Sequence, residues 1–230
     1  MSSSRLPGKV LKDLPYGSGV PVLRRIVERV RQARSLDEVV VATSDRSDDD
    51  PVAEAAERIG VHCHRGPLDD VLARYLGAIE AYRLDRVVRI TGDCPCVDAA
   101  IIDGAVSLHE TSAAEFTSNV LPRSYPKGLD VEVADASTLR AIGAEASVPA
   151  DREHVFTYAY VSAPGRFRMS NLKAPAELAD PDLRLTLDTA ADYAFIAGLY
   201  DILGPDFDTV AVMRLVRRHP WLLLVNAQSE

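Results

Sequence analysis

Strand-like and helix-like segments alternate along this chain, and this alternation constrains its fold more than any other feature. Apolar, β-branched runs predict strands at residues 38–43, 61–64 and 86–91. Between the runs, apolar residues recur at helical spacing and predict helices at residues 21–33, 69–82 and 98–109, with another that is capped by Asp50 and opened by Pro51. This order is typical of a doubly wound, three-layer α/β domain, and 230 residues suffice for one such domain, residues 1–230.

The second half of the chain has a different pattern, with shorter and more widely spaced strand-like runs. Strands are predicted at residues 115–119, 129–134, 166–172 and 183–188. Helices are predicted at residues 151–161, 189–203 and 208–218. These strands need not be parallel, so residues from about 115 to 172 are interpreted as an antiparallel insertion. That insertion is a candidate for binding an acceptor or for forming a homodimer. The apolar run 221–225 is interpreted as a buried strand or a packing tail.

Charge and cysteine content exclude several classes of protein. The net charge of −8 argues against a general nucleic-acid binder, because phosphate contacts need a basic surface. No apolar run is long enough to cross a bilayer, so no membrane partner is expected. The three cysteines, Cys63, Cys94 and Cys96, are too few for a disulfide framework. They fit a reducing compartment, and a cytoplasmic location is predicted.

Two acidic residues stand where predicted strands end. Thr91, Gly92 and Asp93 follow the strand at 86–91, and a strand end is where ligands bind in such sheets. Gly92 permits a close approach of the backbone, and the Asp93 carboxylate is a candidate ligand for Mg²⁺. A plain turn is the alternative. Asp188 ends the strand predicted at 183–188, and it could share the metal with Asp93 or cap the following helix.

Other polar groups allow both a functional and an ordinary interpretation. The loop from Ser2 to Lys9 holds serines, a glycine and two cations, which could bind phosphates, or it is an ordinary terminus that no strand precedes. Arg65 could meet a base or a phosphate. Lys127, Asp130 and Glu132 could bind sugar hydroxyls, or they lie on a solvated strand face. Arg152 and His154 could orient a substrate or move a proton, or they belong to a local ion-pair cluster.

The order and spacing of these segments, taken together, resemble one family. The quoted segments are Ser4–Leu11, Ala42–Ser44, Arg65–Gly66, Asp70–Tyr75, Arg89–Pro95, Tyr125–Glu132, Arg152–His154 and Arg184–Asp188. The series resembles the cytidylyltransferases of the spore coat polysaccharide biosynthesis protein F type, relatives of the acylneuraminate and 3-deoxy-manno-octulosonate cytidylyltransferases. The resemblance extends over nearly the whole chain.

The resemblance implies a nucleotide-diphospho-sugar transferase (Rossmann-like) fold and Mg²⁺-dependent transfer of a nucleotide from CTP to a sugar acid in surface polysaccharide biosynthesis. It implies that Asp93 and Asp188 are metal ligands and that Arg5 and Lys9 hold the triphosphate, which makes Arg5, Lys9 and Asp93 the expected catalytic residues. The implied nucleotide-binding set is Ser3, Ser4, Arg5, Lys9, Thr43, Arg65, Thr91 and Gly92. The implied acceptor-binding set is Lys127, Asp130, Glu132, Arg152 and His154.

One departure from the family pattern concerns the first strand. Members of the family begin with an apolar strand ahead of the serine loop, and this sequence lacks it. We therefore expect exposed apolar faces and unpaired backbone groups where that central strand would lie. Either translation starts upstream or this product is impaired. One alternative to a nucleotidyltransferase is a glycosyltransferase that uses a nucleotide sugar on the same kind of fold. The other is a silent binding protein, left so by the missing strand.

Overall fold

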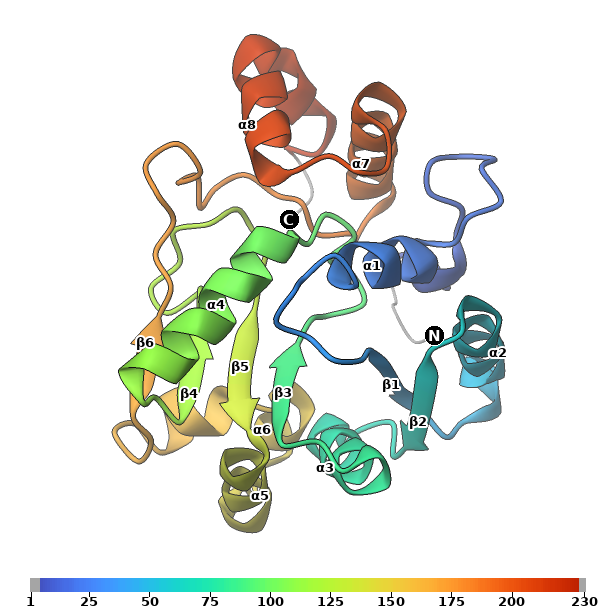
Figure 1. Ribbon diagram of the computed structural model, residues 1–230. Helices are drawn as coiled ribbons and strands as arrows, with labels where there is room; N and C mark the ends of the chain where they lie inside the picture. Colours follow the sequence, from blue (N-terminus) through green and yellow to red (C-terminus); the bar gives the residue numbers. More distant parts are fainter. Residues whose placement is uncertain (1–4, 228–230) are drawn as a thin grey trace.

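The N-terminal part of the chain forms a small parallel sheet. The computed structural model describes residues 5–227, so the predicted nucleotide-binding residues Ser3 and Ser4 lie outside the described residues (Figure 1). A 3₁₀ turn at Lys9–Leu11 precedes α1 (Val22–Val30), and β1 (Val40–Ser44), α2 (Asp50–Ile59) and β2 (His62–Gly66) follow. β1 and β2 are parallel and joined through α2, with Val40 opposite His62 and Ser44 opposite Gly66.

A second, four-stranded sheet lies beside the first. Helix α3 (Val71–Tyr82) leads into β3 (Arg86–Arg89), which is followed by α4 (Ala99–Ser112). The other strands are β4 (Phe116–Ser118), β5 (Glu132–Asp135) and β6 (Met169–Asn171), and the spatial order is β3-β5-β4-β6. β5 is antiparallel to both of its neighbours, while β6 is parallel to β4. The mixed α/β fold with antiparallel pairs in the second half is as the sequence predicted.

Helices cover both faces of this sheet, because successive strand residues point to opposite sides. On β3, Val88 packs into the core formed with α1, α4 and α7, whereas Val87 packs into the core formed with α3 and α5. The remaining helices are α5 (Ala136–Glu145), α6 (Pro149–His154), a π-helical turn (Tyr158–Ser162), α7 (Ala190–Leu203), α8 (Thr209–Arg218) and a 3₁₀ segment (Pro220–Val225). In Figure 1, α4 crosses one face of the sheet, and α7 and α8 lie at its upper end.

Three predictions about local structure are wrong, and a fourth holds in one of its two alternatives. Residues 183–188 are extended but form no strand, since their only ladder contact is an isolated bridge between Arg184 and Lys127. The helix predicted at 151–161 ends at His154, after which Val155 has a φ of 63°. Asp49, not Asp50, is the N-cap of α2. Of the two interpretations of residues 221–225, the strand is wrong, because they form a 3₁₀ segment; Leu222 packs that segment into the core, in agreement with a packing tail.

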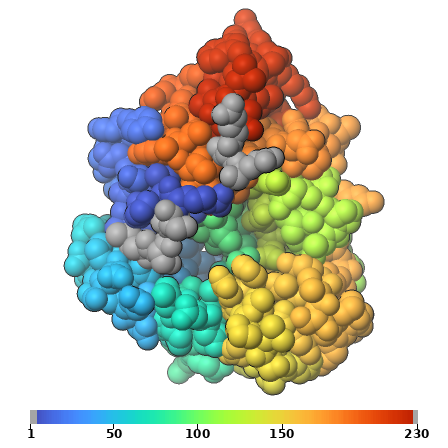
Figure 2. Space-filling view, turned by 180° about the vertical axis from the view of Figure 1, so that it is seen from behind, coloured from blue at the N-terminus to red at the C-terminus, as the bar shows by residue number. Residues whose placement is uncertain are grey.

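The two sheets are separate. No backbone ladder joins β1 to β3 among the described residues. Seen from behind, the molecule is hollowed between the blue N-terminal segment and the teal and yellow segments (Figure 2). None of the helices within residues 5–227 combines the length and the hydropathy that crossing a bilayer requires.

Candidate active site

Asp93 lies in the loop that follows β3, and neighbouring polar groups hold its carboxylate in place. The Thr91 hydroxyl donates a hydrogen bond to Asp93 Oδ1 at 2.6 Å. Lys9 Nζ donates to Asp93 Oδ2 at 3.1 Å. The Asp93 carbonyl accepts a bond from the Leu187 N–H at 2.8 Å, which joins this loop to the extended segment 183–188. The carboxylate therefore has a fixed position between the N-terminal segment and a distant part of the chain.

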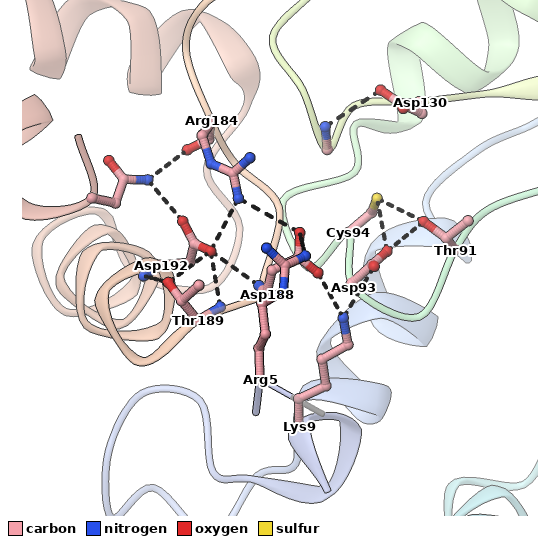
Figure 3. A network of polar contacts seen from close by, with 12 residues as sticks. Arg5, Lys9, Thr91, Asp93, Cys94, Asp130, Arg184, Asp188, Thr189 and Asp192 are labelled. Carbon is pink, nitrogen blue, oxygen red and sulfur yellow. Dashed lines mark hydrogen bonds and ion pairs between the residues drawn. The ribbon is translucent and has the colours of Figure 1, made fainter. Parts of the chain in front are cut away.

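Asp188 meets Asp93 at the same ammonium group. Lys9 Nζ donates to Asp188 Oδ1 at 3.0 Å, so one cation bridges two carboxylates that are far apart in the sequence (Figure 3). Arg5 and Arg184 approach Asp188 Oδ2 at 3.6 and 3.5 Å. Asp188 therefore contacts three cationic side chains, those of Arg5, Lys9 and Arg184.

Helix α7 fixes the backbone beside Asp188. Thr189 caps this helix in a capping box with Asp192, whose side chain is fully buried. Asp192 Oδ2 also accepts a bond from the Asp188 N–H at 3.1 Å. The helix-capping role considered for Asp188 thus belongs to Thr189, which leaves both Asp188 oxygens directed at cations.

Lys9 reaches this position from a tight turn. Gly8 has a φ of 66°, in the left-handed region that favours glycine, and the 3₁₀ turn starts at the next residue. Only 15% of the Lys9 side chain is exposed, against 29% for Asp93 and 21% for Asp188. In this partly dehydrated setting, the attraction between the charges is stronger than in water.

Burial and charge act in opposite directions on Asp93. Burial tends to raise the pKa of this carboxyl, but the Lys9 ammonium and the Thr91 hydroxyl outweigh it, and the pKa lies below its usual value of 3.8. Asp93 is therefore ionised at neutral pH. The adjacent Cys94 thiol is buried, and burial together with the Asp93 charge raises its pKa well above the usual range, so it stays neutral.

The donor set of the site fits magnesium better than a structural metal. Within the described part of the chain, no group of three His, Cys, Asp or Glu side chains is placed to hold a metal ion. Two carboxylates do converge, with a single positive charge between them. Mg²⁺ is usually held by one or two carboxylates plus substrate phosphates. Asp93 and Asp188 therefore suit a metal that arrives with a triphosphate.

The other predicted nucleotide-binding residues lie around the ends of the strands. Thr43, at the end of β1, donates to Asp49 Oδ2 at 2.9 Å. Arg65, on β2, donates to the Ser44 carbonyl at 3.0 Å and pairs with Asp50 at 2.7 Å. Both side chains are thus engaged with the turn between β1 and α2 rather than with the Lys9 cluster. Gly92 is exposed, directly beside Asp93.

Two of the predicted acceptor residues, Asp130 and Glu132, are paired with arginines. Glu132 is 7% exposed and pairs with Arg89 on the neighbouring strand, and burial raises its pKa despite that cation. Asp130 is held by Arg123 through two hydrogen bonds of 2.5 and 2.8 Å. Lys127 is exposed on the turn before them. The interpretation of Asp130 and Glu132 as an ordinary solvated strand face is therefore wrong, because each carboxylate has its own arginine.

Arg152 and His154 lie on α6 in different environments. Arg152 Nε donates to Asp70 Oδ2 at 2.6 Å, and its Nη1 donates to the Ala146 carbonyl at 3.0 Å. Arg152 thus ties the start of α3 to the end of α5. His154 is exposed at the end of α6. The structure does not bring these two side chains to the Lys9 cluster.

Arg184 is a site residue that the sequence reasoning missed. It contacts Asp192 Oδ2 at 3.2 Å as well as Asp188. Its Nε and the Thr186 hydroxyl are buried without a hydrogen-bond partner among the described residues. The signal was present, because Leu183, Leu185 and Leu187 are buried and the residues between them must face the other way.

Comparisons with known proteins show the family of this chain. The family model described as cytidylyltransferase matches residues 1–201. The spore coat polysaccharide biosynthesis protein SpsF of Bacillus subtilis is 35% identical over 96% of this chain and 92% of that protein. A solved cytidylyltransferase structure from Leptospira borgpetersenii is 32% identical, with a TM-score of 0.88 over 96% of this chain and 92% of that one. A 3-deoxy-manno-octulosonate cytidylyltransferase of Geobacter sulfurreducens is 35% identical over 46% of this chain and 40% of its own.

The chain belongs to the cytidylyltransferase family and is a nucleotidyltransferase. The resemblance inferred from the sequence motifs is confirmed, and so is the nucleotide-diphospho-sugar transferase fold.

Proposed function

We propose that this protein transfers CMP from CTP to a sugar acid and releases pyrophosphate, as a step in the synthesis of a surface polysaccharide. The observation that carries the proposal is the bridge of Lys9 between Asp93 and Asp188. Two carboxylates suited to Mg²⁺ and a cation suited to phosphate converge there from three separate segments. The family match supports CTP as the nucleotide.

In the proposed reaction, an acceptor hydroxyl oxygen attacks the α-phosphorus of CTP, and its proton passes to solvent water. The new oxygen–phosphorus bond forms as the bond to the bridging oxygen of pyrophosphate breaks, and pyrophosphate leaves with the bond electrons. Arg5 and Lys9 turn from the carboxylates to the phosphate oxygens and stabilise the charge of the leaving group. Arg184 and Thr91 keep Asp188 and Asp93 in position. Bound Mg²⁺ would supply charge neutralisation at the phosphates.

A sugar acid is the proposed acceptor because a carboxylate fits the cationic lining of the site. Arg184 has an unpaired buried Nε among the described residues, and Lys127 is exposed beside the bridge that joins it to Arg184. The relative from Geobacter sulfurreducens is named for such a sugar acid, 3-deoxy-manno-octulosonate. We place the reaction in the cytoplasm, where the free cysteines Cys63, Cys94 and Cys96 would remain reduced.

A homodimer is also proposed, through residues 115–172. Val148, Val161 and Met169 are exposed there, and apolar side chains of this size on a surface favour contact with another protein. Light scattering at several protein concentrations measures the oligomeric state, and a monomer at all concentrations would contradict the dimer.

The deciding experiment is a pyrophosphate-release screen of the four nucleoside triphosphates, each with Mg²⁺ and a set of sugar acids. We expect release with CTP and at least one sugar acid, and none with neutral sugars. Release with neutral sugars alone would disprove the choice of acceptor. Transfer of a sugar from a nucleotide sugar, without pyrophosphate release, would favour the glycosyltransferase alternative. The absence of both turnover and a CTP-dependent thermal shift would favour the silent binding protein.

A further inference from the structure

The 3₁₀ segment that follows α8 presents apolar side chains to solvent. Four residues of this segment, Pro220–Val225, are exposed: Trp221, Leu223, Leu224 and Val225. Trp221 is 61% exposed and Leu224 is 75% exposed. Side chains three residues apart eclipse each other in a 3₁₀ helix, so Trp221 and Leu224 share one face of the segment. We call these two side chains the apolar patch.

The protein holds the apolar patch in place through two buried residues of the same segment. Leu222 is 7% exposed and packs into the core with residues of α7 and α8. Asn226 is 4% exposed, and its side-chain amide donates to the Arg184 carbonyl at 3.2 Å and to Asp192 Oδ1 at 3.3 Å. These contacts fix the backbone on which the apolar patch stands, so the exposure of the patch is a property of the fold.

Three cations lie on the helix directly before the apolar patch. Arg214, Arg217 and Arg218 of α8 are exposed, whereas the apolar side chains of this helix face the core. Residues 209–227 contain no Asp or Glu. Arg217 donates to the Glu177 carbonyl at 2.9 Å, but none of the three arginines forms an ion pair among the described residues. Their charges are therefore free to meet an anionic partner.

The cations and the apolar patch are contiguous. His219 directly follows Arg218, and its ring lies edge-on to the Trp221 ring with a centroid distance of 6.4 Å. We call the three arginines and the apolar patch together the docking tip. Figure 1 places α8 at the upper end of the molecule, and in Figure 2 the red end of the chain forms the top of the molecule. A flat surface can therefore reach this end while the rest of the molecule stays clear of it.

The charge of the docking tip is opposite to the charge of the whole chain. The chain has a net charge of −8, while the tip carries three positive charges and no negative one. The last carboxylates before α8, Asp206 and Asp208, precede the start of the helix. The ten residues of the helix separate them from Arg218 by about 15 Å. The docking tip therefore attracts anions although the molecule as a whole repels them.

An anionic lipid surface fits both parts of the docking tip. Arginines near a membrane are attracted to anionic headgroups, and tryptophan and leucine favour the boundary between headgroups and acyl chains. A second copy of the chain fits less well, because a twofold contact through the tip would bring two sets of three arginines together. No membrane partner is expected from the length of apolar runs, but binding at a surface requires no run of spanning length.

We propose that the docking tip binds this protein reversibly to a membrane surface that contains anionic lipid. The arginines contact headgroup phosphates, and the apolar patch enters the layer between the headgroups and the acyl chains. This interaction goes beyond the proposed function and does not depend on it, since none of the side chains of the docking tip belongs to the candidate active site.

The test uses the fluorescence of Trp221, the only tryptophan of the chain, which reports on the docking tip alone. One set of vesicles contains equal parts of phosphatidylglycerol and phosphatidylcholine, the other contains phosphatidylcholine only, and both carry brominated acyl chains as quenchers. With phosphatidylglycerol, we expect a blue shift, quenching by the brominated chains and co-sedimentation at least tenfold stronger than with phosphatidylcholine only. Equal co-sedimentation with both sets, or emission that the brominated chains do not quench, would overturn the proposal.

A pair of double variants separates the docking tip from the net charge of the protein. Arg214→Gln combined with Arg218→Gln removes two exposed cations of the tip. Arg46→Gln combined with Arg58→Gln removes the same charge from exposed positions at and before α2. We expect binding to phosphatidylglycerol vesicles to fall at least tenfold in the first variant and to stay unchanged in the second. An equal loss in both variants would refute the docking tip as the binding site.

Two substitutions of Leu224 test the apolar patch and keep Trp221 as the reporter. Leu224→Ser should weaken binding to phosphatidylglycerol vesicles about fivefold and reduce quenching, whereas Leu224→Met should bind as the wild type does. Equal binding by the two variants would contradict insertion of the patch. A blue shift that grows with protein concentration in the absence of vesicles would assign the tip to contact between copies and would also overturn the proposal. All of these measurements omit nucleotide, so loss of pyrophosphate release does not affect their outcome.

Discussion

Replacing Lys9 by methionine should change the affinity for metal and for nucleotide in opposite directions. Methionine keeps the length of the side chain but removes the ammonium that bridges Asp93 Oδ2 at 3.1 Å and Asp188 Oδ1 at 3.0 Å. The ammonium lies where a divalent cation could contact both carboxylates. Under the proposed mechanism, it would compete with metal when no nucleotide is present and would be needed when a triphosphate is bound.

The expected magnitude follows from the geometry. Both carboxylates contact one nitrogen, so their oxygens lie within about 6 Å of each other, where Coulomb's law gives about 3 kcal/mol of repulsion at an effective dielectric constant of 20. In Lys9→Met this repulsion is no longer offset until a cation binds. Because each 1.4 kcal/mol is a factor of ten, we expect Mn²⁺ to bind the nucleotide-free variant about tenfold to a hundredfold more tightly.

Titration calorimetry with Mn²⁺ in the absence of nucleotide measures this effect. Lys9→Arg keeps the charge and should bind Mn²⁺ as weakly as the wild type, and Lys127→Met removes an exposed lysine as a matched control. In the same Lys9→Met variant, CTP-dependent pyrophosphate release should fall at least a hundredfold. Equal or weaker Mn²⁺ binding by Lys9→Met would refute the reasoning that Lys9 holds the place of a metal ion.

Three further predictions concern Asp93 and one buried arginine. Asp93→Asn should lower the rate of pyrophosphate release at least a hundredfold with an unchanged circular dichroism spectrum, and a wild-type rate would count against its role. The pKa of Asp93 in the folded protein is below 3.8, so its ionisation contributes stability that is fully present above pH 3.8. This stability is lost as the pH falls through the folded pKa. Urea unfolding between pH 2 and 5 should show the loss of stability in the wild type and a smaller loss in Asp93→Asn. Arg29 donates to the carbonyls of Val97, Pro205 and Phe207, so Arg29→Met should reduce the free energy of unfolding by about 3 kcal/mol, measured in urea, and a loss below 1 kcal/mol would mean that those carbonyls find other partners.

The parts of the fold that were predicted from the sequence are those in which periodicity and burial coincide. The run at 38–43 and the amphipathic pattern at 21–33 each become an element, β1 and α1, with ends shifted by one to three residues. The segment 183–188 shows why alternation alone is insufficient. Its leucines are buried and its other residues face the site, as in a strand, but Lys127 offers only one bridge. Periodicity reports which side is buried and carries no information on whether a neighbouring edge is available for pairing.

Only some residues of the candidate site could be predicted from the sequence. Gly92 and Asp93 follow a clear strand, so their position at a strand end was derivable. The meeting of Lys9 with Asp188 was not, because it depends on how the N-terminal segment crosses the end of the second sheet. Arg29 was also missed, since an arginine on a helix usually faces water, whereas this one is 4% exposed and stacks on Phe207. Such long-range partners leave no local periodicity in the sequence.

The Lys9 bridge adds to the burial of Leu6 and Leu14 in the core, and together these contacts hold the N-terminal segment although no backbone ladder does. Residues 5–39 contain no strand among the described residues, so no sheet hydrogen bonds fix this segment. Instead, Lys9 ties it to the loop after β3 and to the segment before α7, while Tyr193 of α7 donates to the carbonyl of Asp13. A triphosphate that draws Lys9 away from the carboxylates removes two of these ties. We therefore expect nucleotide binding to be coupled to the anchoring of the segment, with the Tyr193 contact retained when Lys9 moves.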